Sequence, residues 1–127
     1  MEAYKVAGDA FKPTVTLDQE NGVFAFSGRS IPENATAAFE PILNWWSEYL
    51  QTPNKETVID LNFDYINSSS MKQLVKLFGM LDEANSKATA VKVMWHYSSD
   101  DTDSKAQASR LSKMVKFPIK IVADTTK

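Results

Sequence analysis

The spacing of apolar residues changes once between residues 58 and 81, and this change constrains the fold more than any other feature. Over residues 58–63 apolar and polar side chains alternate, so Ile59, Leu61 and Phe63 share one face, as in a half-buried strand. Beyond residue 70 apolar residues recur every three or four positions, which is typical of an amphipathic helix. A strand that leads directly into a helix is therefore predicted here.

The same two patterns alternate along the rest of the chain. Strands are predicted at residues 14–17, 23–26, 58–63, 91–97 and 118–123, and helical patterns cover residues 35–50, 71–81 and 108–115. Strands that alternate with helices indicate a sheet with parallel members and right-handed crossovers. We expect an α/β fold, with a mixed β-sheet of about four to five strands and three helices packed mainly on one face.

The chain is long enough for one domain, and we expect residues 1–127 to form it. Residues 1–12 are weakly patterned and are interpreted as a loose arm or a short edge strand. A hairpin is predicted after them, because Asn21 and Gly22 lie between two β-rich segments and this pair accepts positive φ in a turn.

Trp45 and Trp46 are adjacent within the first predicted helix. Neighbouring residues of a helix point about 100° apart, so both rings cannot face the centre of one core. We expect the pair to straddle the edge of the apolar stripe, with one ring at the surface, where an exposed aromatic side chain can also anchor a partner.

Composition excludes several functions. The net charge is −2 with both signs scattered along the chain, so no basic surface for nucleic acid or anionic lipid is expected. There is no cysteine, which removes disulfides, thiol catalysis and thiolate metal sites. No apolar run reaches the length of a signal peptide or the roughly 18 residues of a spanning helix. We expect a cytoplasmic protein without membrane insertion.

Catalytic and metal-binding patterns are weak. The single histidine, His96, lies in a predicted strand and is interpreted as a structural or surface residue, and no P-loop, nucleophile elbow or glycine fingerprint is present. Asp60 and Asp64 could together bind Mg²⁺, but two carboxylates at this spacing are common in protein sequences and are weak evidence for a metal site. We therefore predict neither an enzyme nor a metal site nor a cofactor.

The acidic segment after residue 98 matches a calcium-binding loop only in part. Asp101 and Asp103 resemble its start, but Lys105 stands where a third oxygen ligand belongs. The closing glutamate and the required glycine are also missing. These acids are interpreted as the solvated start of a helix.

Three consecutive hydroxyl residues, Ser68, Ser69 and Ser70, occupy the junction between the central strand and its helix. The first N–H groups of a helix are unpaired and carry about half a positive charge, so a serine hydroxyl or a phosphate is accommodated there. One serine is explained by helix capping alone. The other two leave open either a regulated serine or a site for a small anion.

Four segments together resemble the SiaC family of bacterial regulatory phosphoproteins, over nearly the whole chain beyond the first dozen residues. They are residues 28–34 (GRSIPEN), the Phe39-Glu40-Pro41 run with Trp45 and Tyr49, residues 65–72 (YINSSSMK), and residues 95–97 (WHY). The family has a fold similar to the STAS domains of anti-sigma-factor antagonists. That fold agrees with the predicted order of strands and helices.

The resemblance implies a phosphorylation switch. Ser68 matches the family's acceptor position, and Ser69 and Ser70 remain alternatives. Family members are phosphorylated by a dedicated kinase, dephosphorylated by a PP2C-type phosphatase, and bind a GGDEF diguanylate cyclase when unphosphorylated, which promotes cyclic di-GMP synthesis and biofilm formation. The resemblance further implies a partner-binding surface formed by Arg29, Pro32, Glu33, Asn34, Tyr65, Asn67 and Ser69.

Phosphorylation is expected to act as an off signal. A phosphate adds about −1.5 to −2 charge at one surface point, and a partner packed there would have to desolvate it. Arg29 is interpreted as a surface residue, although a guanidinium near Ser68 is what a phosphoserine would pair with. The alternative function is a non-switching STAS-like module that binds a small anion or lipid at the start of the helix, over residues 68–70.

Overall fold

Six strands form one mixed sheet and lie in it in the order in which they occur along the chain. The computed structural model describes residues 1–124. The strands are β1 (Tyr4–Val6), β2 (Thr14–Asp18), β3 (Val23–Ser30), β4 (Glu56–Ile66), β5 (Ala90–Ser98) and β6 (Ile119–Asp124). β2 pairs antiparallel with both β1 and β3, whereas β3, β4, β5 and β6 pair parallel with one another in sequence.

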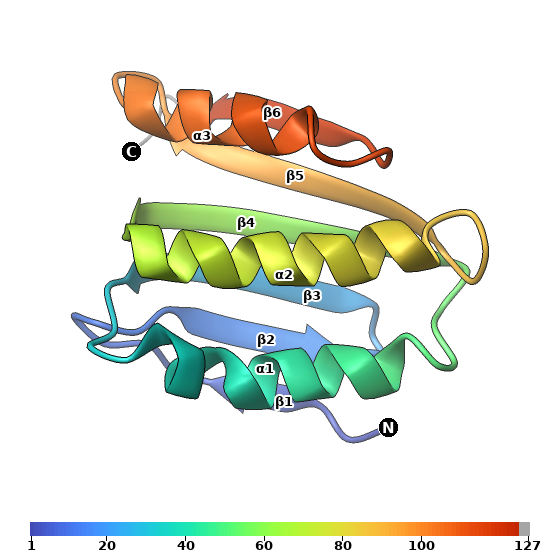
Figure 1. The fold of residues 1–127 in the computed structure, drawn as a ribbon. Helices are drawn as coiled ribbons and strands as arrows, with labels where there is room; N and C mark the ends of the chain where they lie inside the picture. The colour runs from blue at the N-terminus through green and yellow to red at the C-terminus, as the bar shows by residue number, and fades with distance from the viewer. Residues whose placement is uncertain (125–127) are drawn as a thin grey trace.

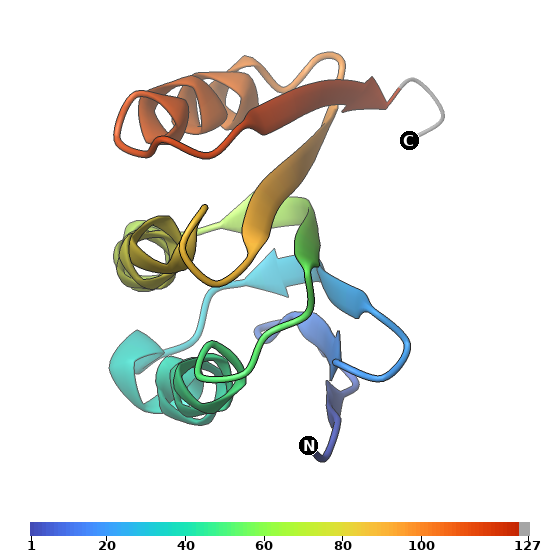
Figure 2. The ribbon, with the colours of Figure 1, turned by 90° about the vertical axis from the view of Figure 1, so that its right-hand side faces the viewer.

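Each helix connects two neighbouring parallel strands. The helices are α1 (Ala35–Tyr49), α2 (Ser68–Ala84) and α3 (Thr102–Ser112). All three cover the same face of the sheet, and all three begin at the same edge of it, where the parallel strands end (Figure 1). Figure 2 shows the other face of the sheet without a helix on it. The predicted α/β class and the three helices on one face are confirmed.

The sheet has six strands, one more than the expected four to five, and the edge-strand alternative for residues 1–12 is confirmed, since β1 lies at the edge of the sheet. Tyr4 lies opposite Leu17, and Val6 lies opposite Val15. β1 has only three residues, too few for an alternating pattern to be recognised in the sequence. The predicted turn between β2 and β3 is confirmed, with Gly22 at a φ of 66°.

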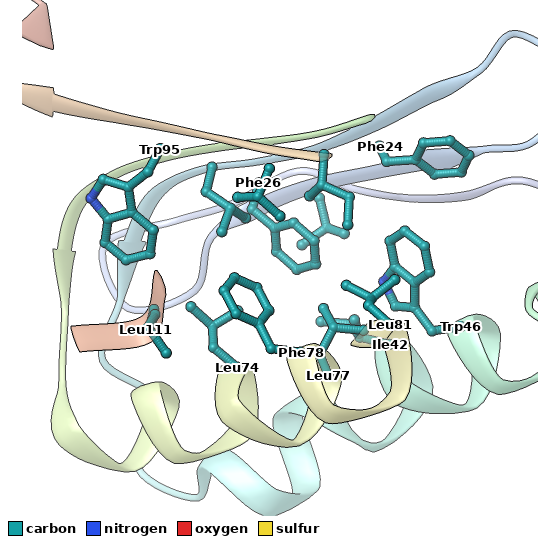
Figure 3. Packing of buried hydrophobic residues seen from close by; sticks show 14 of the residues in the cluster. Phe24, Phe26, Ile42, Trp46, Leu74, Leu77, Phe78, Leu81, Trp95 and Leu111 are labelled. Atoms are coloured by element: carbon teal, nitrogen blue, oxygen red, sulfur yellow. The ribbon is translucent and has the colours of Figure 1, made fainter. Parts of the chain in front are cut away.

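The hydrophobic core lies between the sheet and the three helices. Figure 3 shows side chains of α2 directed toward the sheet, among them Leu74, Leu77 and Phe78. From the sheet they meet Phe26 and Trp95, both almost fully buried. The alternation predicted for the central strand is observed, since Ile59, Leu61 and Phe63 are all buried.

The expectation that one tryptophan reaches the surface is wrong. Trp46 is completely buried, and Trp45 is only 7% exposed. The N-terminal segment covers Trp45, whose indole Nε1 donates a hydrogen bond to the backbone oxygen of Glu2 at 2.9 Å. The Trp45 ring also stacks on Tyr49, with centroids 5.2 Å apart, and it packs against Phe24. Neither ring is therefore an exposed partner anchor.

Candidate functional site

β4 carries one extra residue relative to β3 shortly before it ends. Gly28 lies opposite Phe63, but Arg29 lies opposite Tyr65, so Asp64 is the inserted residue of a β-bulge. Gly28 has a φ of 90°, a conformation that glycine adopts without a steric penalty. A bulge redirects the side chains beyond it. As a result Asp64 and Tyr65 are both exposed at the end of the strand.

The first turn of α2 is capped by the residue that connects it to β4. Asn67 is the N-cap, and its side-chain oxygen accepts a hydrogen bond from the backbone N–H of Ser70 at 2.9 Å. The backbone N–H of Asn67 donates to the carbonyl oxygen of Ser30 at 3.0 Å. The second of these bonds connects the start of α2 to the end of β3.

The three serines have different environments. Ser70 is completely buried, and its hydroxyl accepts a hydrogen bond from the Ser30 hydroxyl at 2.8 Å and donates one to the Ser30 carbonyl oxygen at 3.3 Å. Ser69 is exposed, and its hydroxyl donates to the Asn67 side chain at 3.2 Å. Ser68 is exposed, and its hydroxyl makes no hydrogen bond within residues 1–124. Only Ser68 therefore combines access with an uncommitted hydroxyl.

Ser68 borders an open cleft of about 560 Å³ between the start of α2 and α3. The sheet end and α2 line one side with residues 63–68 and Met71, and the other side is formed by Asp101, Asp103, Ser104, Ala106, Gln107 and Arg110. The charged lining residues are three aspartates, Asp64, Asp101 and Asp103, and one arginine. The cleft is therefore acidic on balance.

Hydrogen bonds at the start of α3 stabilise the α3 side of the cleft. The Asp101 side chain accepts a hydrogen bond from the backbone N–H of Ser104 at 3.0 Å, and the buried Ser104 hydroxyl accepts one from Trp95 Nε1 at 2.9 Å. Just before the helix, the Ser98 hydroxyl donates to the Asp100 carboxylate and lowers the pKa of that carboxyl. Asp101 and Asp103 thus lie at the start of a helix, as predicted.

Five of the seven residues predicted to bind a partner line one of two depressions, and Ser69 and Arg29 line neither. Tyr65 and Asn67 line the Ser68 cleft. Pro32, Glu33 and Asn34 instead line a second, more apolar depression of about 710 Å³ beside the exposed Phe11. This second group borders the start of α1, where the Asn34 side chain caps the helix by accepting the N–H of Ala37.

Arg29 lines neither depression. Its side-chain Nε donates a hydrogen bond to the backbone oxygen of Ala10 at 3.2 Å, so it holds the segment between β1 and β2. The guanidinium that lines the Ser68 cleft is that of Arg110, which the sequence reasoning missed. The available signal was the spacing of Asp103, Gln107 and Arg110, which places three polar residues on one face of a helix.

His96 and Asp60 do not line this cleft, whereas Asp64, the other aspartate weighed for a metal site, does line it. His96 Nε2 is 3.1 Å from the Asp60 carboxylate on the neighbouring strand, and the His96 side chain is 28% exposed. Within residues 1–124, no three or more histidine, cysteine or acidic side chains gather as a possible metal site. In the same part of the chain, no helix is long and apolar enough to span a membrane.

Comparison with known sequences identifies the family of this chain. The sequence profile of the SiaC family of regulatory phosphoproteins matches residues 6–124. The chain belongs to the SiaC family. A relative, an uncharacterised protein of Pseudomonas aeruginosa strain UCBPP-PA14, is 26% identical over 123 residues, which cover 97% of this chain and 98% of that protein.

Solved structures of SiaC share the fold. The crystal structure of apo-SiaC from Pseudomonas aeruginosa is 27% identical with a TM-score of 0.88, and the match covers 97% of this chain and all of that one. A second match is the crystal structure of the diguanylate cyclase SiaD in complex with its activator SiaC, from the same organism. It has a TM-score of 0.89 at 26% identity, over 95% of this chain and 99% of the matched chain.

Proposed function

We propose that this SiaC-family chain binds and activates a GGDEF diguanylate cyclase while Ser68 is unphosphorylated, and that a phosphate on Ser68 ends this binding. Through the cyclase it controls cyclic di-GMP synthesis and biofilm formation. A dedicated kinase and a PP2C-type phosphatase set the state of Ser68, and the chain itself catalyses no reaction.

One observation carries the proposal. The Ser68 hydroxyl is exposed at the start of α2 without a hydrogen bond in the described part of the chain, while Ser70 is buried and Ser69 is bonded to Asn67. Further support comes from the structural match to a SiaC that activates the cyclase SiaD.

The surroundings of Ser68 support the proposal that its phosphorylation is an off signal. A phosphate of charge about −1.5 to −2 would enter a cleft already lined by Asp64, Asp101 and Asp103. A partner packed over this cleft would have to bury that charge, which costs more than releasing the partner unless the partner supplies a cation. The first turn of α2 contains no acidic residue, and its dipole favours a phosphate, so the domain stays folded.

Partner contact is proposed along the edge of the sheet where the helices begin. Tyr65, Asn67 and Ser69 lie beside or near the Ser68 cleft, and Pro32, Glu33 and Asn34 lie along the second depression. Arg29 lies opposite Tyr65 on the neighbouring strand and completes this set. The acidic lining of the cleft disfavours the alternative of a module that holds a small anion or an anionic lipid there.

Binding to the cyclase tests the proposal. Phosphoserine is encoded genetically at position 68, and the affinity for GGDEF cyclases of the host genome is compared with that of the unmodified chain and of Ser68→Ala. We expect the phosphate to weaken binding at least about tenfold, because its burial is unfavourable. Ser68→Ala is expected to bind normally, since the hydroxyl has no hydrogen bond to lose within the described residues.

Phosphoserine encoded at position 47, an exposed serine of α1, adds the same charge elsewhere and serves as the control. Equal affinity of the unmodified chain and the chain with phosphate on Ser68 would overturn the proposal. The natural acceptor is tested separately by mass mapping of the protein isolated from its host, where a phosphate on Ser69 in place of Ser68 would contradict the assignment.

A further inference from the structure

Arg110 is the one positively charged residue among those that line the Ser68 cleft. It lies on α3 and is exposed, and its guanidinium makes no hydrogen bond or ion pair with another residue in the range 1–124. An arginine without a partner that faces three aspartates of the same cleft is available for a stronger acceptor.

A phosphate on Ser68 would be that acceptor. A guanidinium presents two parallel N–H groups to phosphate oxygens, and such a pair is stronger than a neutral hydrogen bond. The carboxylates of Asp64, Asp101 and Asp103 repel the phosphate, so the cleft needs a cation when Ser68 is modified. No other lysine, arginine or histidine among the described residues lines it.

We propose that Arg110 is the intramolecular clamp of phosphorylated Ser68, and that the resulting ion pair bridges the cleft from α3 to the start of α2. This inference rests on the proposed phosphorylation of Ser68. The ion pair between Arg110 and the phosphate would weaken cyclase binding in a second way, beyond the added charge. It would occupy the cleft that the cyclase would otherwise contact. The phosphorylated form is then a distinct, internally paired state.

A purely structural role for Arg110 makes a different prediction. Arg110 lies in the last turn of α3, where a positive charge stabilises the helix dipole whether or not Ser68 is modified. Lys113 is the C-cap residue of the same helix and does not line the cleft. It is therefore a matched control for charge at this end of α3.

The test uses the full chain with phosphoserine encoded at position 68, so it needs neither the natural kinase nor the cyclase. The second pKa of the phosphate, normally about 6, is measured by ³¹P NMR titration in the parent, Arg110→Gln, Arg110→Lys and Lys113→Gln. We expect Arg110→Gln to raise this pKa by roughly half a unit or more, because the dianion loses its partner. Arg110→Lys should fall between, and Lys113→Gln should match the parent.

Thermal unfolding supplies a second readout. Arg110→Gln should lower the melting temperature more in the phosphorylated chain than in the unmodified chain, whereas Lys113→Gln should act equally on both. Equal effects of Arg110→Gln and Lys113→Gln on the phosphate pKa would overturn the clamp. That result is distinct from failure of the proposed function, which shows as unchanged cyclase binding by the phosphorylated chain.

Discussion

The Ser30 hydroxyl donates a 2.8 Å hydrogen bond to the Ser70 hydroxyl, which joins the end of β3 to the first turn of α2 in a fully buried position. The Ser30 carbonyl oxygen also accepts the backbone N–H of Asn67. The first turn of α2, which carries Ser68, is therefore fixed to the neighbouring strand on the core side, while Ser68 itself stays exposed. This arrangement buries Ser70 and leaves Ser68 and Ser69 exposed.

Ser70→Ala tests this connection. The substitution leaves the buried Ser30 hydroxyl without its acceptor, and we expect a loss of about 1 to 3 kcal/mol in the free energy of unfolding. Ser69→Ala is the matched control, because its exposed hydroxyl is expected to contribute less than about 0.5 kcal/mol. Urea denaturation measures both, and equal losses would show that the buried pair does not stabilise the junction.

Much of the fold could be predicted because the buried face of a strand or helix requires apolar residues at a regular spacing in the sequence. The alternation over residues 58–63 and the helical spacing beyond residue 70 are direct consequences of one sheet face and one helix face packing together. The serine run was placed correctly for the same reason. A helix has to begin where the period changes, and Ser68 is the first residue of α2.

What could not be predicted depends on contacts between distant segments. The burial of Trp45 requires the N-terminal residues, which carry no pattern, to lie across it at Glu2. The bulge at Asp64 and the cleft that Arg110 lines depend on how neighbouring strands and helices align. Periodicity shows which face of an element is buried but not what lies beside its polar face.

Asn67 tests the cap of α2. Asn67→Ala removes the acceptor of the Ser70 N–H and should cost about 1 kcal/mol, whereas Asn67→Asp should retain most of that stability. Asn34→Ala removes the corresponding cap of α1 at a similar cost. Hydrogen exchange distinguishes them, because only Asn67→Ala should accelerate exchange in the first turn of α2. Acceleration there by Asn34→Ala alone would contradict the assignment.

A second buried hydroxyl network lies at the opposite end of the sheet. The Thr57 hydroxyl is 2.8 Å from both the Tyr49 hydroxyl and the Thr89 hydroxyl, and Thr57 is completely buried. Thr57→Val keeps the shape but leaves buried hydroxyls without a partner, so we expect a loss of about 1 to 3 kcal/mol in unfolding free energy. Thr16→Val, on a half-buried position of β2, should change stability by less than about 0.5 kcal/mol.

Acid should weaken the turn between β2 and β3. The Asn21 side chain donates a 2.7 Å hydrogen bond to the Asp18 carboxylate, and this bond, with the Asn21 backbone N–H, lowers the pKa of Asp18 below its usual 3.8. A lowered pKa contributes stability that is present above about pH 4 and is lost as the pH falls through the folded-state value. Asp18→Asn should therefore reduce stability at pH 6 and flatten its decline toward pH 3. An equal decline in both proteins, measured by urea unfolding, would contradict this.

Tyr65 offers the sharpest test of where a cyclase would bind under the proposed function. Its side chain is 54% exposed beside Ser68, and Phe11, at 60% exposure, borders the second depression instead. Because neither ring is buried, Tyr65→Ser and Phe11→Ser should each leave the free energy of unfolding within about 0.5 kcal/mol of the parent. An aromatic residue at the centre of an interface typically contributes more than about 1 kcal/mol to binding, so Tyr65→Ser should weaken cyclase binding at least about fivefold. A larger loss for Phe11→Ser than for Tyr65→Ser, measured by calorimetric titration, would move the centre of the interface to the second depression and away from Ser68. The charge of a phosphate on Ser68 would then have to act on the interface from a distance, where salt screens it. The loss of binding affinity caused by the phosphate should therefore become smaller as the ionic strength is raised.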